Sequence, residues 1–348
     1  MKKRLKIAQI GTGHAHAYPA MLALTDLNGD LFDFVGYAET PEDELAPFRS
    51  KPAYSHLKEY TVEEILSMPD LDAVAIETTE LATVKYAKMA AERGLHIHLD
   101  KPGNESSEDF CELLSEMKKR GLILSMGYMY RLNPVIQKAL QTAKSGKIGE
   151  IYSVEVHMSC DHPLDVRKWL SSFQGGMSFF LGCHLTDLIY TLQGTPEEII
   201  PCNCPTNIKG ETGNDFSMAV FRYKNGYSFY KTTAVEKGGF QRRQLVICGT
   251  KGTIEVKPLE EDSEKGGEWK KTRAVYYYLK DGVECSWHAE TEEWEGETKR
   301  YSPMFVDFYN RIVSGEQGEY SLSYEARLHR LVLATCGIEC DYKENIEI

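Results

Sequence analysis

The chain has 348 residues, of which 42% are hydrophobic and 26% are charged. This balance predicts a globular protein with room for two domains and disfavours the fibrous, disordered and membrane-spanning classes. The formal net charge of -12 at pH 7 repels phosphate backbones, and no run of Lys and Arg alternates with aromatic residues. We therefore expect a small-molecule ligand, with no nucleic-acid partner and no membrane partner.

The nine cysteines are odd in number and are spread along the chain, which is typical of reduced thiols rather than of a disulfide framework. The apolar stretch behind the basic N-terminal residues 1–4 is short and runs directly into a glycine-rich turn. It therefore predicts a first strand rather than a secretion signal. Both features predict a cytoplasmic protein.

A glycine-rich turn follows the apolar run 5–10. One glycine permits a tight turn, and the next lets the backbone approach a pyrophosphate, whose charge the N–H groups and dipole of the following helix stabilise. His16 stands where the motif normally has a third glycine. If the helix expected over 14–24 lies farther from the strand, His14 or His16 can reach the phosphates. The predicted phosphate-binding residues are Gly11, Thr12, Gly13, His14, Ala15 and His16.

A second strand over 32–38 completes a β-α-β unit. Glu39 closes this strand, about twenty residues beyond the turn, where an acidic side chain accepts hydrogen bonds from the adenosine ribose diol. Thr40 and Pro41 follow, with no Arg or Lys beside them. A cofactor 2'-phosphate would meet a carboxylate without a guanidinium, so the sequence predicts NAD in preference to NADP.

Strands and helices continue to alternate as far as residue 126. The expected helices are 62–67, 81–93 and 107–120, and the expected strands are 73–77, 96–99 and 123–126. This alternation predicts an N-terminal Rossmann-type domain over 1–132, with a parallel sheet covered on both faces. Because ligands bind at the carboxyl ends of such strands, the cofactor-binding set also includes Thr78, Thr79, Glu80, Asp100 and Lys101.

After residue 134 the pattern changes to a helix over 135–145 and then to long alternating strands. These strands are expected over 151–159, 199–203, 216–223, 227–235, 244–248, 253–257 and 274–279. They predict a C-terminal α+β domain over 133–348, with a large, mainly antiparallel open sheet. Helices over 179–193, 304–314 and 324–342 should cover one face. The open face predicts a homodimer or homotetramer, and the acidic segment 260–271 is expected to be a solvated loop.

Several motifs, in this order along the chain, resemble the glucose-fructose oxidoreductase / inositol dehydrogenase / MocA family. They are the glycine turn, the strand end 99–102, the run 127–134 and the segment 175–187. The resemblance covers nearly the whole chain. It implies a nicotinamide-dependent oxidoreductase that transfers hydride between NAD and a secondary hydroxyl of a sugar, cyclitol or related polyol.

Oxidation of a secondary alcohol needs a group that takes the hydroxyl proton while hydride leaves. Lys101 follows a strand at the ligand edge, and the family's acid-Lys-Pro motif favours catalysis over a surface lysine, although Asp100 replaces the usual glutamate. The resemblance also implies that His184 lines the substrate pocket as an acid/base. Asp187 lies on nearly the same helix face as His184 and is a predicted substrate-binding residue.

The sequence departs from the family at ligand-facing positions: Phe180 stands where the family has an Asp one helical turn before the histidine. Two explanations compete. The proton relay is rebuilt from other residues, of which His157, Asp161 and His162 form the nearest polar cluster, or the chain is a non-catalytic NAD- and sugar-binding protein. A third possibility within the family is glycoside cleavage through transient oxidation by NAD. A divergent dehydrogenase ranks first.

Further substrate and cofactor contacts are predicted at Arg167, Trp169 and Arg131. Arg167 donates to hydroxyl groups and an indole stacks on a pyranose, although Trp169 is equally compatible with the core. Arg131 matches a family arginine near the cofactor, and its alternative is an interdomain salt bridge. No metal site is predicted, because His157, Asp161 and His162 lack a fourth ligand at sensible spacing.

Overall fold

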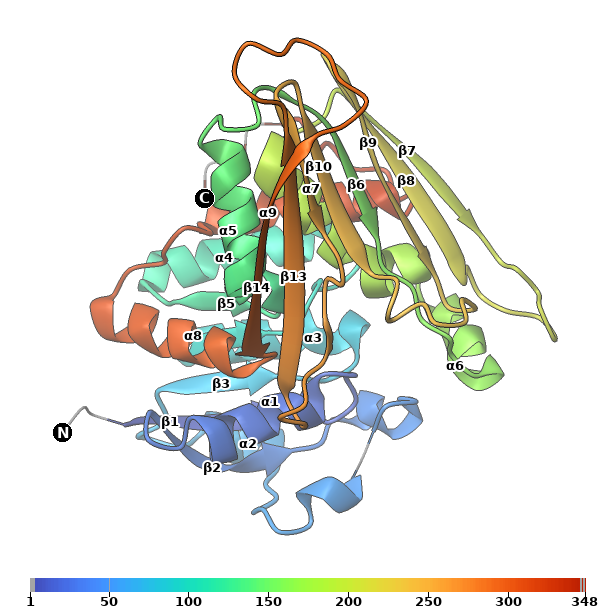
Figure 1. Cartoon of the computed structure of the whole chain (residues 1–348). Coiled ribbons are helices and arrows are strands. Elements are labelled where there is room, and N and C mark those ends of the chain that lie inside the picture. Colours follow the sequence, from blue (N-terminus) through green and yellow to red (C-terminus); the bar gives the residue numbers. More distant parts are fainter. Residues whose placement is uncertain (1–3, 50, 345, 347) are drawn as a thin grey trace. The chain divides into compact units, whose positions relative to one another are not determined.

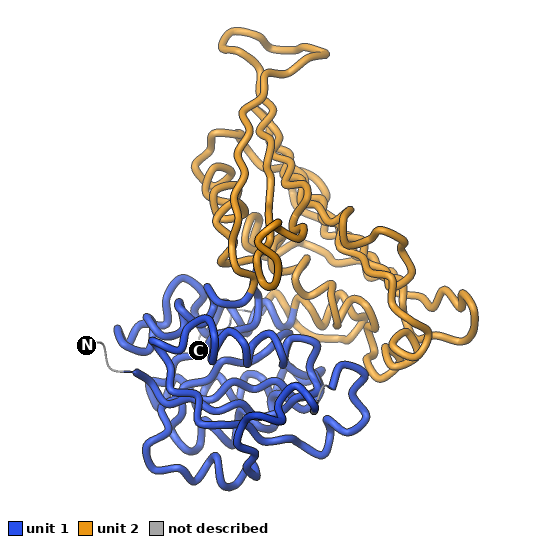
Figure 2. The backbone as a smooth tube through the Cα atoms, turned by 60° about the horizontal axis from the view of Figure 1, so that its bottom comes forward, with its two compact units in different colours: residues 1–129, 301–330, 344–348 blue, residues 130–300, 331–343 orange. Residues whose placement is uncertain are grey.

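The structure is a computed structural model that describes residues 4–49, 51–344, 346 and 348 (Figure 1). Residues 1–3 of the basic N-terminal stretch, which we weighed as a secretion signal, lie outside the described residues. The chain divides into two compact units. Unit 1 comprises residues 1–129, 301–330 and 344–348, and unit 2 comprises residues 130–300 and 331–343 (Figure 2).

Unit 1 contains a parallel sheet in the order β2-β1-β3-β4-β5. Its strands are β1 (Leu5–Ile10), β2 (Phe32–Ala38), β3 (Ala73–Ile76), β4 (His96–Leu99) and β5 (Leu124–Met126). Helices α1 (Ala17–Leu22), α2 (Val62–Leu66), α3 (Thr83–Glu92) and α4 (Ser107–Arg120) connect them. β3 is buried along its whole length, as expected for a parallel strand covered on both faces. The predicted Rossmann-type sheet is confirmed.

The first helix begins later than the predicted residue 14. α1 begins at Ala17 and continues as a π-helical turn over Ala23–Leu27. The backbone N–H of His14 donates to the carbonyl of Glu77 at 3.0 Å, which holds the preceding turn against the end of β3. His14 and His16 therefore lie in the turn rather than on the helix.

Helix α8 (Ser302–Ser314) belongs to unit 1, so its expected place on the second domain's sheet was wrong. The ring of Phe305 packs against Phe32 and His98, with centroid separations of 6.4 and 4.5 Å. An apolar helix face can cover either sheet, and its periodicity does not say which. The tertiary contacts of Phe305 show that α8 covers the sheet of unit 1.

Unit 2 contains a large, mainly antiparallel sheet in the order β12-β13-β11-β10-β6-β9-β8-β7, with β14 paired to β13 (Figure 1). β6 and β9 run parallel. The strands are β6 (Ile151–His157), β7 (Glu198–Cys204), β8 (Phe216–Tyr223), β9 (Gly226–Thr233), β10 (Gln244–Gly249), β11 (Gly252–Val256), β12 (Glu261–Asp262), β13 (Trp269–Tyr278) and β14 (Glu290–Lys299). The predicted fold class is confirmed.

Helices α5 (Pro134–Lys144) and α7 (Cys183–Gln193) contact each other and the strands of this sheet. α7 continues a π-helical turn over Ser178–Gly182, and α6 (Leu164–Trp169) was not predicted. α9 (Leu322–Thr335) ends before the predicted residue 342. The side chains of Tyr152, Tyr227 and Phe229 on β6 and β9 are 44%, 56% and 37% exposed, so this sheet presents aromatic surface. Oligomerisation through it stays a prediction.

The segment 260–271 was expected to be a solvated loop. Its residues 264–267 are exposed and lie between β12 and β13, but the expectation was wrong at both ends. Glu260 is only 2% exposed and lies 2.6 Å from Arg243 and 2.8 Å from Arg300. It also accepts a hydrogen bond from the hydroxyl of Tyr130. Residues 269–271 begin β13. The glutamate is tolerated in the interior because two guanidinium groups and a hydroxyl satisfy its carboxylate.

Strand β14 was also missed. Its first four residues are exposed, so the hydrophobic alternation that marks a half-buried strand is absent there. Pairing with β13 is supported by ion pairs between the strands, such as Arg273 with Glu293 at 2.7 Å. Among the described residues, we find no helix with both the length and the apolar character needed to cross a membrane.

Candidate functional site

The carboxyl ends of β1, β2, β3 and β4 meet at one edge of the unit 1 sheet, and the glycine turn lies among them. The N–H of Gly11 donates to the carbonyl of Ala38 at 2.8 Å, and Asp100 donates its N–H to Ile76 at 3.1 Å. In a parallel sheet the strands present their carboxyl ends to the same side. The fold therefore gathers the predicted cofactor-binding residues of unit 1 at one edge.

Both glycines of the turn are required by the protein's own packing. Gly11 has φ +96°, and a Cβ added there would lie 2.2 Å from the backbone nitrogen of Thr78. A Cβ at Gly13 would lie 2.5 Å from Oδ1 of Asp43. Other residues would clash at these two positions. The turn is held against the end of β3 on one side and against a carboxylate on the other.

Asp43 is a site residue that sequence reasoning missed. It is fully buried and accepts hydrogen bonds from the N–H groups of Thr12 and Gly13, both at 3.1 Å. It also accepts from the N–H of Thr40 at 2.8 Å and from the hydroxyl of Thr78 at 2.9 Å. The turn's own N–H groups thus already bind an anion. The signal was a capping-box pattern, Thr40-x-x-Asp43, which returns the carboxylate to the N–H of Thr40.

Glu39 lies at the end of β2, as predicted, but it has a cationic partner. Arg49 donates to its carboxylate from Nε at 2.9 Å and from Nη2 at 2.6 Å, and Thr12 donates its hydroxyl at 3.1 Å. The premise that no guanidinium accompanies Glu39 was wrong, because the loop folds Arg49 back onto it. A bidentate Arg is also a good partner for a phosphate. The NAD preference therefore stays a prediction.

A cluster of buried titratable side chains lies behind the turn. His14 is 1% exposed, and its Nδ1 lies 2.6 Å from Oδ2 of Asp100. Its Nε2 lies 3.3 Å from Oε1 of Glu80. Nδ1 of His16 lies 3.1 Å from the same Oδ2 of Asp100. Asp100 thus joins both histidines of the turn to the end of β4.

Burial and charge set the protonation of this cluster. Burial opposes ionisation of Asp100, but the facing His14 and His16 rings hold its pKa well below the ordinary value. Burial lowers the pKa of His16 to about 3, against the attraction of Asp100. Burial, reinforced by the charge of Asp100, raises the pKa of Glu77 well above its ordinary value. At neutral pH, Asp100 is therefore a carboxylate and His16 a neutral imidazole, and the protonated form of Glu77 is favoured.

Lys101 follows Asp100 and is only 1% exposed. Its N–H donates to Oδ1 of Asp100 at 2.6 Å. Lysine is almost never fully buried unless it is paired. The burial of Lys101 therefore excludes the surface-lysine alternative.

The predicted site residues of unit 2 form two buried groups. His184 is 2% exposed and packs edge-on against Tyr130, with 5.5 Å between ring centroids. Nε of Arg131 donates to both carboxylate oxygens of Asp187, at 3.1 and 3.0 Å, and Nη2 donates at 2.8 Å. Arg131 and Asp187 thus pair with each other, so the salt bridge of Arg131 lies inside unit 2 rather than between domains.

Two other predicted contacts have structural partners. Arg167 is 4% exposed, lies 3.3 Å from Asp215 and donates to the carbonyl of Ile208 at 2.8 Å. Trp169 is half-buried and packs edge-on against Phe180 at 5.6 Å. Phe180 therefore fills an aromatic contact at the position where the family has an acid.

Two members of the polar cluster considered as a rebuilt proton relay have other partners. His157 Nε2 lies 2.9 Å from Glu236, whereas Asp161 is exposed and pairs with Lys237. Within the described part of the chain, the histidine, cysteine and acidic groups close enough to share a metal ion are His14, His16 and Asp100. These residues had been predicted to bind cofactor, not metal.

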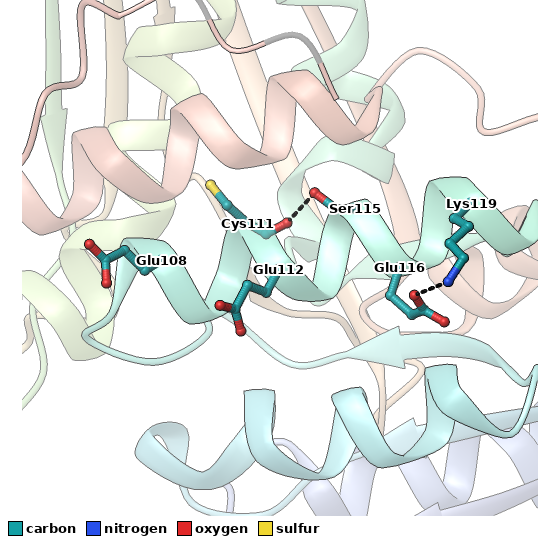
Figure 3. A pocket seen from close by; sticks show the side chains of 6 residues that line it. All are labelled: Glu108, Cys111, Glu112, Ser115, Glu116 and Lys119. Carbon is teal, nitrogen blue, oxygen red and sulfur yellow. Dashed lines mark hydrogen bonds and ion pairs between the residues drawn. The ribbon is translucent and has the colours of Figure 1, made fainter.

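A surface hollow elsewhere in unit 1 contains none of the predicted site residues. Figure 3 shows that its side chains all come from α4 and that Lys119 pairs with Glu116. The two charged groups lie 3.4 Å apart. Charged pairs of this kind on a helix surface contribute little to the stability of the fold. The residues that line it are Glu108, Cys111, Glu112, Ser115, Glu116 and Lys119. Nothing in this hollow resembles a catalytic arrangement.

Comparison with known families agrees with this geometry. Residues 5–128 match the model of the oxidoreductase family with an NAD-binding Rossmann fold, and residues 136–255 match the GFO/IDH/MocA C-terminal domain. The chain belongs to the GFO/IDH/MocA family. The family match supports binding of a nicotinamide cofactor and places the protein among oxidoreductases.

Two of the relatives are named for their action on a sugar or a polyol. The chain is 26% identical over 202 residues to a D-xylose 1-dehydrogenase (NADP(+)) of Haloferax volcanii, covering 56% of this chain and 59% of that protein. It is 22% identical over 271 residues to a myo-inositol 2-dehydrogenase of Thermotoga maritima, covering 74% and 77% of the two chains. The oxidoreductase YhhX of Escherichia coli is 27% identical over 210 residues, which cover 60% of this chain and 59% of YhhX. The chain thus matches about three fifths of the length of several of these relatives.

Solved structures share the fold over nearly the whole chain. A levoglucosan dehydrogenase in complex with NADH and levoglucosan has a TM-score of 0.76 at 18% identity, covering 96% of this chain and 98% of that one. The crystal structure of YhhX has a TM-score of 0.75 at 22% identity, covering 96% and 97%. At these identities the likeness concerns the fold.

The edge of the unit 1 sheet fits the adenosine half of a dinucleotide better than it fits the pyrophosphate. The Glu39 side chain is 13% exposed and can accept from ribose hydroxyls. The N–H groups of Thr12 and Gly13, which the motif offers to phosphates, donate to Asp43. In this member of the GFO/IDH/MocA family the phosphate-binding turn is thus partly satisfied from within.

Proposed function

We propose that the protein is an NAD-dependent dehydrogenase that transfers hydride between the nicotinamide and a secondary hydroxyl of a sugar, cyclitol or related polyol. The observation that carries this proposal is the buried Lys101, 1% exposed at the end of β4 beside the glycine turn. The family match and the sugar- and polyol-oxidising relatives support the substrate class.

In this proposal Glu39 binds the adenosine ribose and Lys101 handles the proton. A bound nicotinamide supplies the hydride chemistry. Lys101 then donates a proton to the carbonyl oxygen in the reducing direction, and its neutral amine accepts the hydroxyl proton in the oxidising direction. Its neighbours favour this role, because the carboxylate of Asp100 binds the Lys101 backbone N–H and fixes the start of the chain that carries the ammonium.

His184 lies in unit 2, in the first turn of α7, and is buried against Tyr130. The acid/base role that the resemblance implies for it stays a prediction. We assign the proton transfer to Lys101 of unit 1.

The experiment is turnover by the full chain and by Lys101→Met, with NAD and a panel of sugars and polyols. Methionine keeps the length and apolar stem of the lysine and removes the ammonium. Loss of a positioned general acid/base lowers the turnover number by about 10²- to 10⁴-fold. Lys119→Met is the matched control, because the Lys119 side chain is 75% exposed on α4, and it should retain full turnover.

Two results would overturn the proposal. Unchanged turnover in Lys101→Met removes this lysine from the mechanism. Stabilisation of the wild-type chain by NAD, without reduction of the cofactor by any substrate of the panel, instead identifies a binding protein. Isothermal titration with NAD, run on both variants, separates loss of chemistry from loss of cofactor binding.

A further inference from the structure

The histidines of the glycine turn converge on the carboxylate at the end of β4. His14, His16 and Asp100 each offer one ligand atom, and these atoms all lie within 4.8 Å of one another. His14 and Asp100 are 1% exposed, and the His16 side chain is 13% exposed. We propose that His14, His16 and Asp100 form a binding site for a divalent transition-metal ion, for which Zn²⁺ is the reference.

Two ring nitrogens of the glycine turn converge on one oxygen of Asp100. Nδ1 of His14 lies 2.6 Å and Nδ1 of His16 lies 3.1 Å from Oδ2 of this buried carboxylate. A metal ion bound by the two nitrogens replaces the ring protons that otherwise bridge them to the carboxylate. The negative charge of Asp100 then stabilises the bound cation.

Glu80 supplies a second and independent observation. It is 1% exposed, and within the described part of the chain neither of its carboxylate oxygens has a hydrogen-bond partner. Its Oε1 lies 3.3 Å from Nε2 of His14, the ring nitrogen opposite to the one that faces Asp100. Histidines that bind a metal through one nitrogen commonly donate the other N–H to a carboxylate, which fixes the tautomer and the ring orientation. Glu80 stands in that position behind His14.

The donor set favours a transition metal over Ca²⁺ or Mg²⁺. Imidazole nitrogens are borderline donors of the kind that Zn²⁺, Co²⁺ and Ni²⁺ prefer, and Zn²⁺ also binds carboxylates, whereas Ca²⁺ and Mg²⁺ prefer oxygen donors alone. Three protein ligands leave an open position in a tetrahedral site, as in catalytic rather than structural zinc sites. An oxygen ligand, either water or a hydroxyl of the substrate, suits that position.

The site also gives a reason for the departure from the glycine motif. His16 occupies the position of the third glycine, and the His14-x-His16 spacing within one turn brings both Nδ1 atoms to Asp100. The shorter Asp100 replaces the family's usual glutamate at the same place. The substitutions at the turn and at the end of β4 thus meet in one constellation.

The test measures metal binding by the full chain without any nicotinamide cofactor, so its outcome does not depend on the proposed dehydrogenase activity. The chain is stripped with a chelator and titrated with Zn²⁺, and the bound metal is counted by mass spectrometry. We expect one Zn²⁺ per chain. Co²⁺ in its place should give the visible absorption of a four- or five-coordinate ion.

Matched variants locate the site. His16→Gln and Asp100→Asn each remove one ligand and should weaken Zn²⁺ binding by more than about 100-fold, and Glu80→Gln should weaken it by about 10- to 100-fold. His56→Gln changes an exposed histidine of the same unit and should bind as the wild type does. Circular dichroism confirms the fold of each variant.

Two outcomes overturn the proposal. One is a wild-type chain that binds less than a tenth of an equivalent of Zn²⁺ and gives only the spectrum of aqueous Co²⁺. The other is equal binding by the wild type, His16→Gln and Asp100→Asn. If both ligand variants fail to fold, the wild-type stoichiometry and Co²⁺ spectrum decide the matter alone.

Discussion

Asp43→Asn tests whether the glycine turn is held by an internal anion. Both carboxylate oxygens of Asp43 accept backbone hydrogen bonds: Oδ1 accepts from Gly13, and Oδ2 accepts from Thr12 and Thr40. An asparagine has the same shape but only one oxygen. In either orientation its NH2 group faces at least one backbone N–H, so the variant removes acceptor capacity without opening a cavity.

The expected loss in the free energy of unfolding is worked out for the more favourable of the two amide orientations. With the amide oxygen at Oδ2, the N–H groups of Thr12 and Thr40 keep an acceptor, but an uncharged one, while the N–H of Gly13 loses its acceptor. A buried unsatisfied N–H costs about 1–3 kcal/mol, and loss of charge from two hydrogen bonds costs about 0.5–1.5 kcal/mol each. The hydroxyl of Thr78 rotates to accept from the new NH2 group. The expected loss in the free energy of unfolding is roughly 2–6 kcal/mol.

The assay combines urea unfolding, followed by circular dichroism, with hydrogen exchange of the peptide that contains the turn. The amides of Thr12 and Gly13 should exchange faster in Asp43→Asn, because their acceptor is weakened or lost. Asp33→Asn is the control. The Asp33 side chain is 52% exposed and lies 3.7 Å from Arg4, so its loss should change stability by less than about 0.5 kcal/mol.

The reasoning fails if Asp43→Asn unfolds within about 1 kcal/mol of the wild type and protects the turn amides equally well. That result would mean that the turn is held by the packing of its glycines against Thr78, and not by the carboxylate.

Two further predictions concern cofactor choice and pH. Glu39→Ala should free Arg49, which now pairs with Glu39 at 2.6 Å, and shift relative affinity from NAD towards NADP by about 10-fold or more, since a bidentate guanidinium binds phosphate well. Titration calorimetry with NAD and with NADP measures this shift in affinity. Unchanged affinities would refute the prediction. Glu63→Ala, which changes an exposed residue, is the control. Burial lowers the pKa of His329 from 6.5 to about 4, so the unfolded state binds the proton first. Stability should be full above about pH 6.5 and fall by about 3 kcal/mol towards pH 4. His329→Gln should remove that part of the acid sensitivity in urea titrations, and an identical pH slope in both proteins would contradict the assignment.

Much of the fold was predictable, because its signals are local. The alternation of short apolar runs with amphipathic stretches predicts the parallel sheet of unit 1, and the period-two strands predict the sheet of unit 2. The helix predicted over 107–120 is α4, and Gly121 ends it in the left-handed conformation. β14 escaped because exposed, charged strands lack the alternation.

The sequence predicted where the candidate site lies, but not which side chains contact one another there. Sequence placed Glu39, Asp100 and Lys101 at the ends of successive strands, which a parallel sheet brings to one edge. It did not reveal that Arg49 returns to Glu39 or that Asp43 fills the anion position of the turn. Those contacts depend on the path of the loop after β2, which no local periodicity encodes.

The glycine turn illustrates what the sequence determines by itself and what only the tertiary structure decides. By itself the sequence determined that a tight turn follows the first strand and that His16 stands in place of the motif's third glycine. Only the tertiary structure decided that Asp43 binds the turn's N–H groups and that His14 and His16 meet Asp100. The reason is physical: backbone conformation is chosen by neighbouring residues, whereas the partner of a buried charge is chosen by whatever the fold brings within hydrogen-bonding distance.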